Sequence, residues 1–295
     1  MRVLIAGCGD VGGQLGLTLA RAGVNVVGLR RDAARIPAPI EAIAADLVDP
    51  TTFPAWPADV ETVFYTAAAD GPDETAYRGA YVAGLSGVLS WIHAHGAASS
   101  VRRVFFTSST AVYGQEHGEW VDESSATEPR HFTGRILLEA EELALASGLP
   151  VTIVRFAGIY GPGRTRLVTG VRDGTLTCHD GAPTYSNRIH RDDCAGFLAH
   201  LALHVPAPAP IYVGVDDEPT DRCTVYHWLA DRLGTAPPHR ALEPPSSGPG
   251  GRGGSKRCSN ARLRATGYRL RFPTFRDGYG TLVGDCSPPR PALAE

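Results

Sequence analysis

Short apolar segments alternate with longer amphipathic ones along the first half of the chain. The short segments are bounded by turn residues and have the composition of strands; they cover residues 3–6, 24–29, 40–45, 60–66, 101–107 and 151–156. The longer segments have the length and apolar spacing of crossover helices and cover 11–22, 76–95 and 134–147. This β-α-β alternation predicts an α/β fold, a doubly wound parallel Rossmann sheet with helices on both faces.

The composition changes after residue 157, which predicts where the Rossmann domain (1–157) ends. From 158 the chain is richer in Pro, Gly and Arg. We interpret 158–285 as a smaller C-terminal substrate-binding region, from which the chain can cross back into the Rossmann domain. Segments 206–210 and 234–254 are typical of linkers or mobile loops, and 286–295 of a flexible tail.

Charge and cysteine usage narrow the class of partner. The net charge of -3 and the pI near 6.4 come without a long run of like charges, so the sequence lacks the basic footprint of a nucleic-acid-binding protein. No apolar run approaches the roughly 18 residues of a membrane span, and the first residues enter a strand directly, which predicts a cytoplasmic protein. The cysteines show no C-x-x-C pair and no zinc-like spacing, which predicts reduced thiols and no metal site; they are Cys8, Cys178, Cys194, Cys223, Cys258 and Cys286.

The strongest local motif is the G-x-G-x-x-G of residues 7–12, placed between a predicted strand and a predicted helix. Gly7 allows a tight turn, Gly9 lets the backbone approach a pyrophosphate, and Gly12 permits close helix–strand packing. The helix N-terminus adds N–H donors and the positive end of its dipole. A merely structural glycine turn is the alternative, but the context favours a dinucleotide cofactor.

The end of the second predicted strand favours NADP(H) over NAD(H). An NAD-specific site usually offers a carboxylate to the ribose 2′-hydroxyl here, whereas this chain has Arg30 and Arg31. Arginine makes charge-assisted contacts to a 2′-phosphate. A solvated surface pair is the alternative, and the neighbouring Asp32 leaves the register open. Asp46 after the third strand is placed to accept a hydrogen bond from adenine, or to cap the next helix.

Six motifs occur in the order seen in extended and atypical short-chain dehydrogenase/reductases: GCGDVG, AADLVDP, VFYTAAAD, TSSTAVYG, VRFAGIYGPGR and NRIHRDDCA. The chain most resembles the NAD(P)-dependent epimerase/dehydratase group. The resemblance implies a Rossmann domain, a smaller substrate domain and an active site between them. It implies cofactor contacts at Gly7, Gly9, Asp10, Val11, Gly12, Arg30, Arg31, Asp46, Leu47, Thr66, Ala67, Ala68, Arg135 and Phe156.

In that family a Ser or Thr polarises the substrate oxygen, and a Tyr with a Lys four residues later moves the proton. Ser109 matches the hydroxyl, with Thr110 beside it, but His131 and Arg135 stand where Tyr and Lys belong. An imidazole titrates near pH ~6.5 and needs no lysine to bring it into range. The alternative is that His131 is a loop residue and Arg135 a surface cation, so that catalysis is lost or falls to another residue. Tyr113 is the reserve proton donor.

The substrate contacts that the resemblance implies are Ser109, Thr110, Tyr160, Arg164 and Arg188. The arginines would suit a phosphorylated or nucleotide-linked small molecule, or they lie on a solvated face. The leading hypothesis is an NAD(P)-dependent oxidoreductase or epimerase that transfers hydride to or from a secondary alcohol or ketone. A non-catalytic NADP(H)-binding sensor or interaction protein is the alternative. The sequence lacks the nucleophile elbow and zinc motif of hydrolases. The helices at 76–95 and 134–147 are candidates for a homodimer interface.

Overall fold

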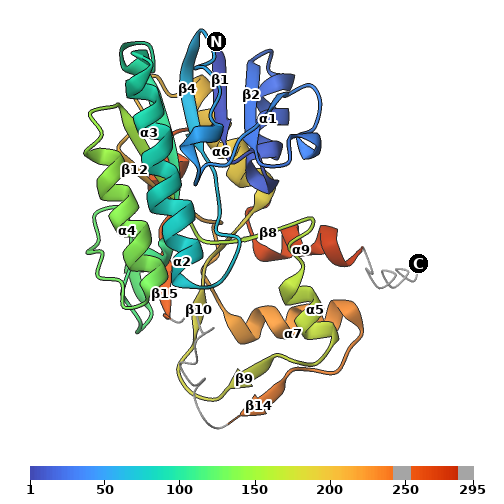
Figure 1. The fold of residues 1–295 in the computed structure, drawn as a ribbon. Helices are drawn as coiled ribbons and strands as arrows, with labels where there is room; N and C mark the ends of the chain where they lie inside the picture. Colours follow the sequence, from blue (N-terminus) through green and yellow to red (C-terminus); the bar gives the residue numbers. More distant parts are fainter. Residues whose placement is uncertain (242–253, 285–295) are drawn as a thin grey trace.

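A seven-stranded parallel sheet forms the centre of the computed structural model, which describes residues 1–241 and 254–284 (Figure 1). Its strand order is β12-β7-β5-β4-β1-β2-β3. The strands are β1 (Arg2–Ala6), β2 (Asn25–Arg30), β3 (Glu41–Ala44), β4 (Val60–Tyr65), β5 (Arg103–Ser109), β7 (Val151–Phe156) and β12 (Ile211–Gly214). The order reverses between β1 and β4, which is the switch point where doubly wound sheets bind ligands. The predicted Rossmann-like α/β fold is confirmed.

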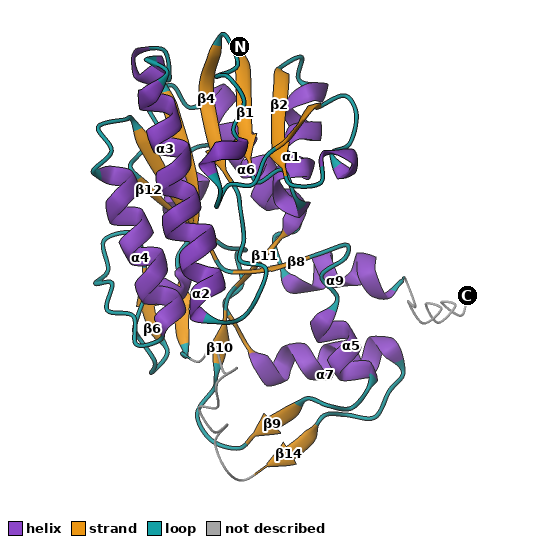
Figure 2. Ribbon diagram, viewed as in Figure 1, coloured by secondary structure: helices purple, strands orange, loops and turns teal. Residues whose placement is uncertain are grey.

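Helices cover both faces of the sheet, as the alternating pattern predicts (Figure 2). One face carries α1 (Asp10–Arg21) and α6 (Arg191–His204), and the other α3 (Gly84–Ala94) and α4 (Phe132–Leu145). Because the inner strands are apolar on both sides, two separate cores form. The first includes Ile5, Leu15, Phe64 and Phe197, and the second Leu4, Ile92, Phe106 and Leu137.

The predicted helix at 76–95 is not uniform. It consists of α2 (Glu74–Tyr77), a π-helical turn (Arg78–Ala83) and α3. The hydroxyl of Tyr65 donates to the carbonyl of Ala80 within that turn. π-turns inside helices are frequent at functional sites, and Ala80 lines the cleft described below.

The chain after residue 157 divides between two places. The helix α6 and the strand β12 return to the Rossmann sheet, whereas α5 (Arg166–Arg172), α7 (Arg222–Leu233) and α9 (Phe275–Val283) pack around a core of their own. The short helix α8 is Ala261–Ala265. The described residues also form four two-stranded sheets: β6 (Glu119–Val121) with β15 (Lys256–Cys258), β8 (Gly158–Tyr160) with β11 (Arg188–His190), β9 (Thr177–His179) with β14 (His239–Ala241), and β10 (Tyr185–Ser186) with β13 (Thr220–Asp221).

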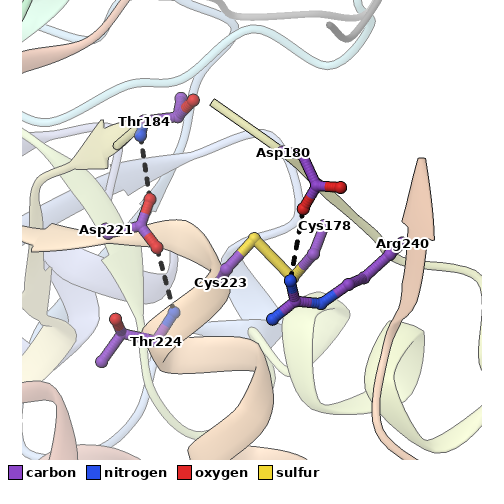
Figure 3. The surroundings of a disulfide bond; sticks show 7 residues. All are labelled: Cys178, Asp180, Thr184, Asp221, Cys223, Thr224 and Arg240. Carbon is purple, nitrogen blue, oxygen red and sulfur yellow. Dashed lines mark hydrogen bonds and ion pairs between the residues drawn. A yellow bond between two sulfur atoms is a disulfide. The ribbon is translucent and has the colours of Figure 1, made fainter. Parts of the chain in front are cut away.

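A disulfide joins Cys178 of β9 to Cys223 of α7, so the prediction that all cysteines are reduced thiols is wrong (Figure 3). The two residues are 45 positions apart, and the packing of β9 against α7 brings their Cα atoms to 5.4 Å. Sequence spacing alone does not reveal such a pair. The carboxylate of Asp221 caps α7 beside the disulfide by accepting from the backbone N–H of Thr224 (3.2 Å). Cys8, Cys194 and Cys258 are buried free thiols.

Parts of the predicted linker and tail, 242–253 and 286–295, together with Cys286, lie outside the described residues. Across 1–241 and 254–284, no helix is both long and apolar enough to cross a membrane. The same ranges contain no group of three or more His, Cys, Asp or Glu side chains arranged to hold a metal ion.

Candidate active-site cleft

A cleft of about 1050 Å³ runs along the carboxyl-terminal edge of the central sheet. One wall is formed by the residues that end β2, β4, β5 and β7 and those that follow β1 and β3. The other wall includes β10, the start of α7 and the start of β15. The cleft therefore lies between the Rossmann sheet and the C-terminal segments, where ligands of doubly wound folds bind.

The glycine loop occupies the middle of this edge. Gly7 has a φ of +89°, a conformation that other residues adopt only with strain. A Cβ on Gly12 would lie 2.5 Å from Oγ1 of Thr66 and 2.6 Å from the carbonyl oxygen of Gly7, so only glycine lets α1 approach β4 this closely. Gly7, Gly9 and Val11 line the cleft, whereas Gly12 packs beneath it. Burial raises the pKa of the Cys8 thiol to about 11, which leaves it unreactive.

Asp10 connects the glycine loop to the C-terminal half of the chain. Its carboxylate pairs with the Arg164 guanidinium and, at 3.2 Å, with Nη1 of Arg191. Asp10 and Arg164 both line the cleft. Arg164 is one of the predicted substrate contacts. Because Asp10 already balances its charge, Arg164 instead links the glycine loop to the C-terminal half of the chain.

Arg30 and Arg31 lie together at one end of the cleft, where no carboxylate follows β2 in the lining. Arg30 donates to the carbonyl of Arg35 (3.4 Å). Arg31 pairs with Asp70 (2.8 Å), and the side chains of Arg31 and Asp70 are largely exposed. Asp46 also lines this end, and its Oδ1 accepts from the backbone N–H of Val48 (3.1 Å). The remaining predicted cofactor contacts in the lining are Leu47, Thr66, Ala67, Ala68 and Phe156.

Ser109, the last residue of β5, and His131, just before α4, line the same cleft. The Ser109 hydroxyl accepts from the backbone N–H of Ala111 (3.2 Å), and Thr110 beside it is buried. His131 is the N-cap of α4, and its Nδ1 lies 3.0 Å from Oγ1 of Thr133 and accepts from the Thr133 N–H (3.4 Å). This arrangement directs the other ring nitrogen, Nε2, away from the helix end.

Arg135 does not lie where the prediction put it. It is exposed on α4, outside the cleft lining, and its guanidinium donates to the carbonyl of Arg130 (2.5 Å). Residues four apart share a face only when both are helical. Because His131 has extended cap geometry (φ -90°, ψ 147°), its side chain and that of Arg135 point to different surroundings. From this position Arg135 does not hold a ribose in the cleft.

Tyr113 reaches the cleft wall with a hydroxyl that is already engaged. It accepts from Nη1 of Arg155 (2.9 Å), and burial raises the pKa of Tyr113 to about 12. Arg155 in turn pairs with Glu141 of α4 (2.6 Å), whose Oε1 accepts from the Ser108 hydroxyl (2.5 Å). All four side chains are buried. The network serves to fix β5, β7 and α4 around the site, and the raised pKa makes Tyr113 a poor reserve proton donor.

Sequence reasoning missed several residues of the far wall. Arg222, at the start of α7, and Lys256, at the start of β15, line the cleft near Tyr185 and Asn187. Lys256 is nine-tenths buried, although it is the one lysine among 28 Lys and Arg residues. The presence of a single lysine in the chain is a signal that the sequence alone could have provided.

Comparison with known proteins agrees with this geometry. A family model described as NAD(P)H-binding matches residues 7–204, from the glycine loop to the end of α6. The chain belongs to this NAD(P)H-binding family. The family description names NAD(P)H, and the lining from Gly7 to Phe156 fits a dinucleotide of that kind. The match agrees with the resemblance to atypical short-chain dehydrogenase/reductases.

Individual relatives match 80% or more of the chain. Protein YeeZ of Escherichia coli is 31% identical over 80% of this chain and 85% of its own length. A 3-diazoavenalumate denitrifying reductase of Streptomyces is 30% identical over 95% of this chain and 99% of its own. A structure from Methylobacillus flagellatus named as an NAD-dependent epimerase/dehydratase is 38% identical, with a TM-score of 0.79 over 96% of this chain and 97% of that one.

Two of the substrate contacts predicted for this chain, Tyr160 and Arg188, lie behind the cleft. Tyr160 stacks on Tyr279 in the C-terminal core, with 4.3 Å between ring centroids. Arg188 is buried and donates to the Ser186 hydroxyl (2.6 Å). Neither lines the cleft, because the pairing of β8 with β11 carries both side chains into the core instead.

A buried carboxyl beside these residues predicts a pH dependence of stability. Burial raises the pKa of Asp216 to about 8, above that of an unfolded Asp near ~3.9. Its folded-state protonation therefore contributes stability that is complete below the unfolded pKa and is lost as pH rises towards 8. The charged or titratable groups that face it are Arg188, Glu218, Asp217, Tyr160 and Tyr279.

We expect Asp216→Asn to lose less stability than the wild type between pH 5 and pH 8, because the amide stays neutral throughout. Urea unfolding at the two pH values measures this difference. Asp231→Asn on the exposed side of α7 is the control and should follow the wild type. Equal losses in Asp216→Asn and the wild type would contradict the assignment.

Proposed function

We propose that this protein is an NADP(H)-dependent oxidoreductase that transfers hydride between the nicotinamide and a secondary alcohol or ketone. The observation that carries the proposal is that one cleft joins the glycine loop at Gly7 to the hydroxyl of Ser109 and the ring of His131. The bound cofactor would supply or accept the hydride, and the chain's own residues would supply polarisation and proton transfer.

Ser109 is the residue that would polarise the substrate oxygen. Its hydroxyl accepts from a backbone N–H, so its own hydrogen is available to donate into the cleft. One such donor aimed at developing charge typically contributes ~10²–10³ in rate.

His131 would move the proton, and its partner Thr133 suits both protonation states. With a neutral ring, Nδ1 accepts from the Thr133 N–H, so the ring proton resides on Nε2. With a charged ring, Nδ1 donates to the Thr133 hydroxyl (3.0 Å) and Nε2 keeps its proton for the substrate. The cap position therefore fixes the ring while it cycles between acid and base.

Net reduction, with cofactor exchange at each turnover, is the reaction we favour over epimerisation. The Streptomyces relative is named as a reductase. The largely exposed Arg31 at the cofactor end of the cleft suits a cofactor that binds and leaves. An epimerase retains its cofactor through a transient oxidation and has no need of exchange.

Activity with NADPH tests the proposal. We expect a screen of ketones and aldehydes to show NADPH oxidation that falls about 10²-fold or more in Ser109→Ala and in His131→Phe, since each removes a group that acts in the transition state. The matched control is Arg135→Gln, which alters the nearby exposed cation outside the cleft and should keep full turnover. Full activity in Ser109→Ala and His131→Phe would refute both roles.

The sensor hypothesis makes a different prediction for the same samples. If no carbonyl compound is turned over, yet NADPH raises the melting temperature with a Kd in the micromolar range, cofactor binding without catalysis is supported. That outcome would replace the oxidoreductase proposal.

A further inference from the structure

Two cations face the cleft from either side of β10. The backbone N–H of Arg222 donates to the carbonyl of Thr184 (3.0 Å), just before β10. On the other side, the amide of Asn187 donates to the carbonyl of Lys256 (2.9 Å), just after β10. These contacts hold the backbone of Arg222 and of Lys256 next to the two ends of β10. Tyr185, Asn187, Arg222 and Lys256 all line the cleft.

Lys256 is a buried cation with little compensation. Its Nζ donates to the carbonyl of Tyr113 (3.1 Å), which satisfies one of three ammonium hydrogens. Burial lowers the pKa of Lys256, and the charge of Arg222 acts in the same direction, whereas Cys258, Glu116 and Glu119 raise it. A buried charge without a counter-ion is costly, so proteins rarely keep one without a use.

Nearby carboxylates do not supply that counter-ion. Glu116 lines the cleft and acts on Lys256 through its charge, but its carboxylate pairs with Arg130 at 2.6 Å. Within the described chain, no ion pair is seen for Arg222 or Lys256. Glu116 and Arg130 balance each other's charge, which leaves the positive charges of Arg222 and Lys256 facing the cleft.

We infer that Lys256 and Arg222 bind the carboxylate of a carboxylic-acid substrate. The inference rests on the proposed function, because it names the class of substrate that the same cleft takes. A carboxylate carries one charge and two oxygens, which match one ammonium and one guanidinium. A phosphate has more oxygens than these two cations can pair with, so at least one of its oxygens would lack a cationic partner here. The site lies on the substrate side, since Lys256 contacts the chain four residues after Ser109.

The single lysine makes a direct test possible. Protein labelled with [¹³Cε]lysine gives one lysine signal, so the pKa and ligand response of Lys256 are read without assignment, with and without NADP. The probe is acetate, added at constant ionic strength against chloride. We expect a saturable shift of the signal and a rise in the Lys256 pKa, because the anion stabilises the charged form.

Matched variants locate the site. Arg222→Gln should weaken acetate binding about tenfold, the range expected for one charged hydrogen bond, whereas Arg102→Gln at the opposite edge of the sheet should leave it unchanged. The neutral analogue acetamide should give no shift, and inorganic phosphate a weaker one. The inference is overturned by an absent response to acetate, by an equal response to acetamide, or by tighter binding of phosphate.

This readout separates the inference from the proposed function because it requires no turnover. Acetate binding at Lys256 without any NADPH oxidation would keep the carboxylate site and reject the oxidoreductase. NADPH oxidation that is equal for a keto acid and its methyl ester, with no acetate response, would keep the oxidoreductase and reject the site.

Discussion

Glu141→Ala is expected to lower the free energy of unfolding by about 3–5 kcal/mol, the range for breaking a buried ion pair by removing one partner. Glu141 accepts two hydrogen bonds from Arg155 through Nε and Nη2 and a third from the Ser108 hydroxyl. Its removal leaves the guanidinium of Arg155, a residue that is 4% exposed, without a counter-charge. Urea unfolding followed by circular dichroism measures the loss as a lower transition midpoint.

The neighbouring Glu142 provides the matched control. It lies on the exposed side of the same helix, so Glu142→Ala should change stability by no more than about 0.5 kcal/mol. The double variant Glu141→Leu with Arg155→Met, which replaces the pair by apolar groups, should recover much of the loss. If Glu141→Ala and Glu142→Ala have equal effects, the network does not stabilise the fold as described.

The Rossmann half could be predicted from the sequence because its signals are local. The strand predicted at 151–156 coincides with β7. The close helix–strand packing predicted at Gly12 is found, because a Cβ there would collide with Thr66. The prediction at 40–45 differs from β3 by one residue at each end. Such signals depend on neighbouring residues and on backbone sterics rather than on distant contacts.

The second wall of the cleft could not be predicted in the same way. Lys256 reaches the site through the pairing of β15 with β6, whose residues are more than a hundred positions earlier, and Arg222 through the pairing of β13 with β10. Two- and three-residue strands carry no readable period. The misplacement of Arg135 has another cause. The family spacing suggests that Arg135 shares a site with His131, although the predicted helix begins at residue 134 and His131 is indeed the cap outside it.

Replacing Arg30 and Arg31 together by glutamine is expected to raise the Kd for NADPH by about 10- to 100-fold and to change the Kd for NADH by no more than a few-fold. Both guanidinium groups stand in the lining after β2, where a 2′-phosphate would need positive charge. Each charge-assisted contact contributes about 1.5–3 kcal/mol when well formed, and less at an exposed site such as this one. Fluorescence titration of both reduced cofactors measures the ratio.

The ion pair between Arg31 and Asp70 (2.8 Å) makes this prediction sharper. A 2′-phosphate must compete with the Asp70 carboxylate for Arg31, so Asp70→Asn should tighten NADPH binding a few-fold while leaving NADH unchanged. Arg21→Gln, at the far end of α1, alters an exposed arginine away from the cleft and should affect neither cofactor. Equal weakening of NADPH and NADH in the Arg30 and Arg31 variant would show that these residues shape the cleft without reading the phosphate. Opposite effects of the arginine and Asp70 substitutions on NADPH alone would instead identify this end of the cleft as the element that selects the cofactor.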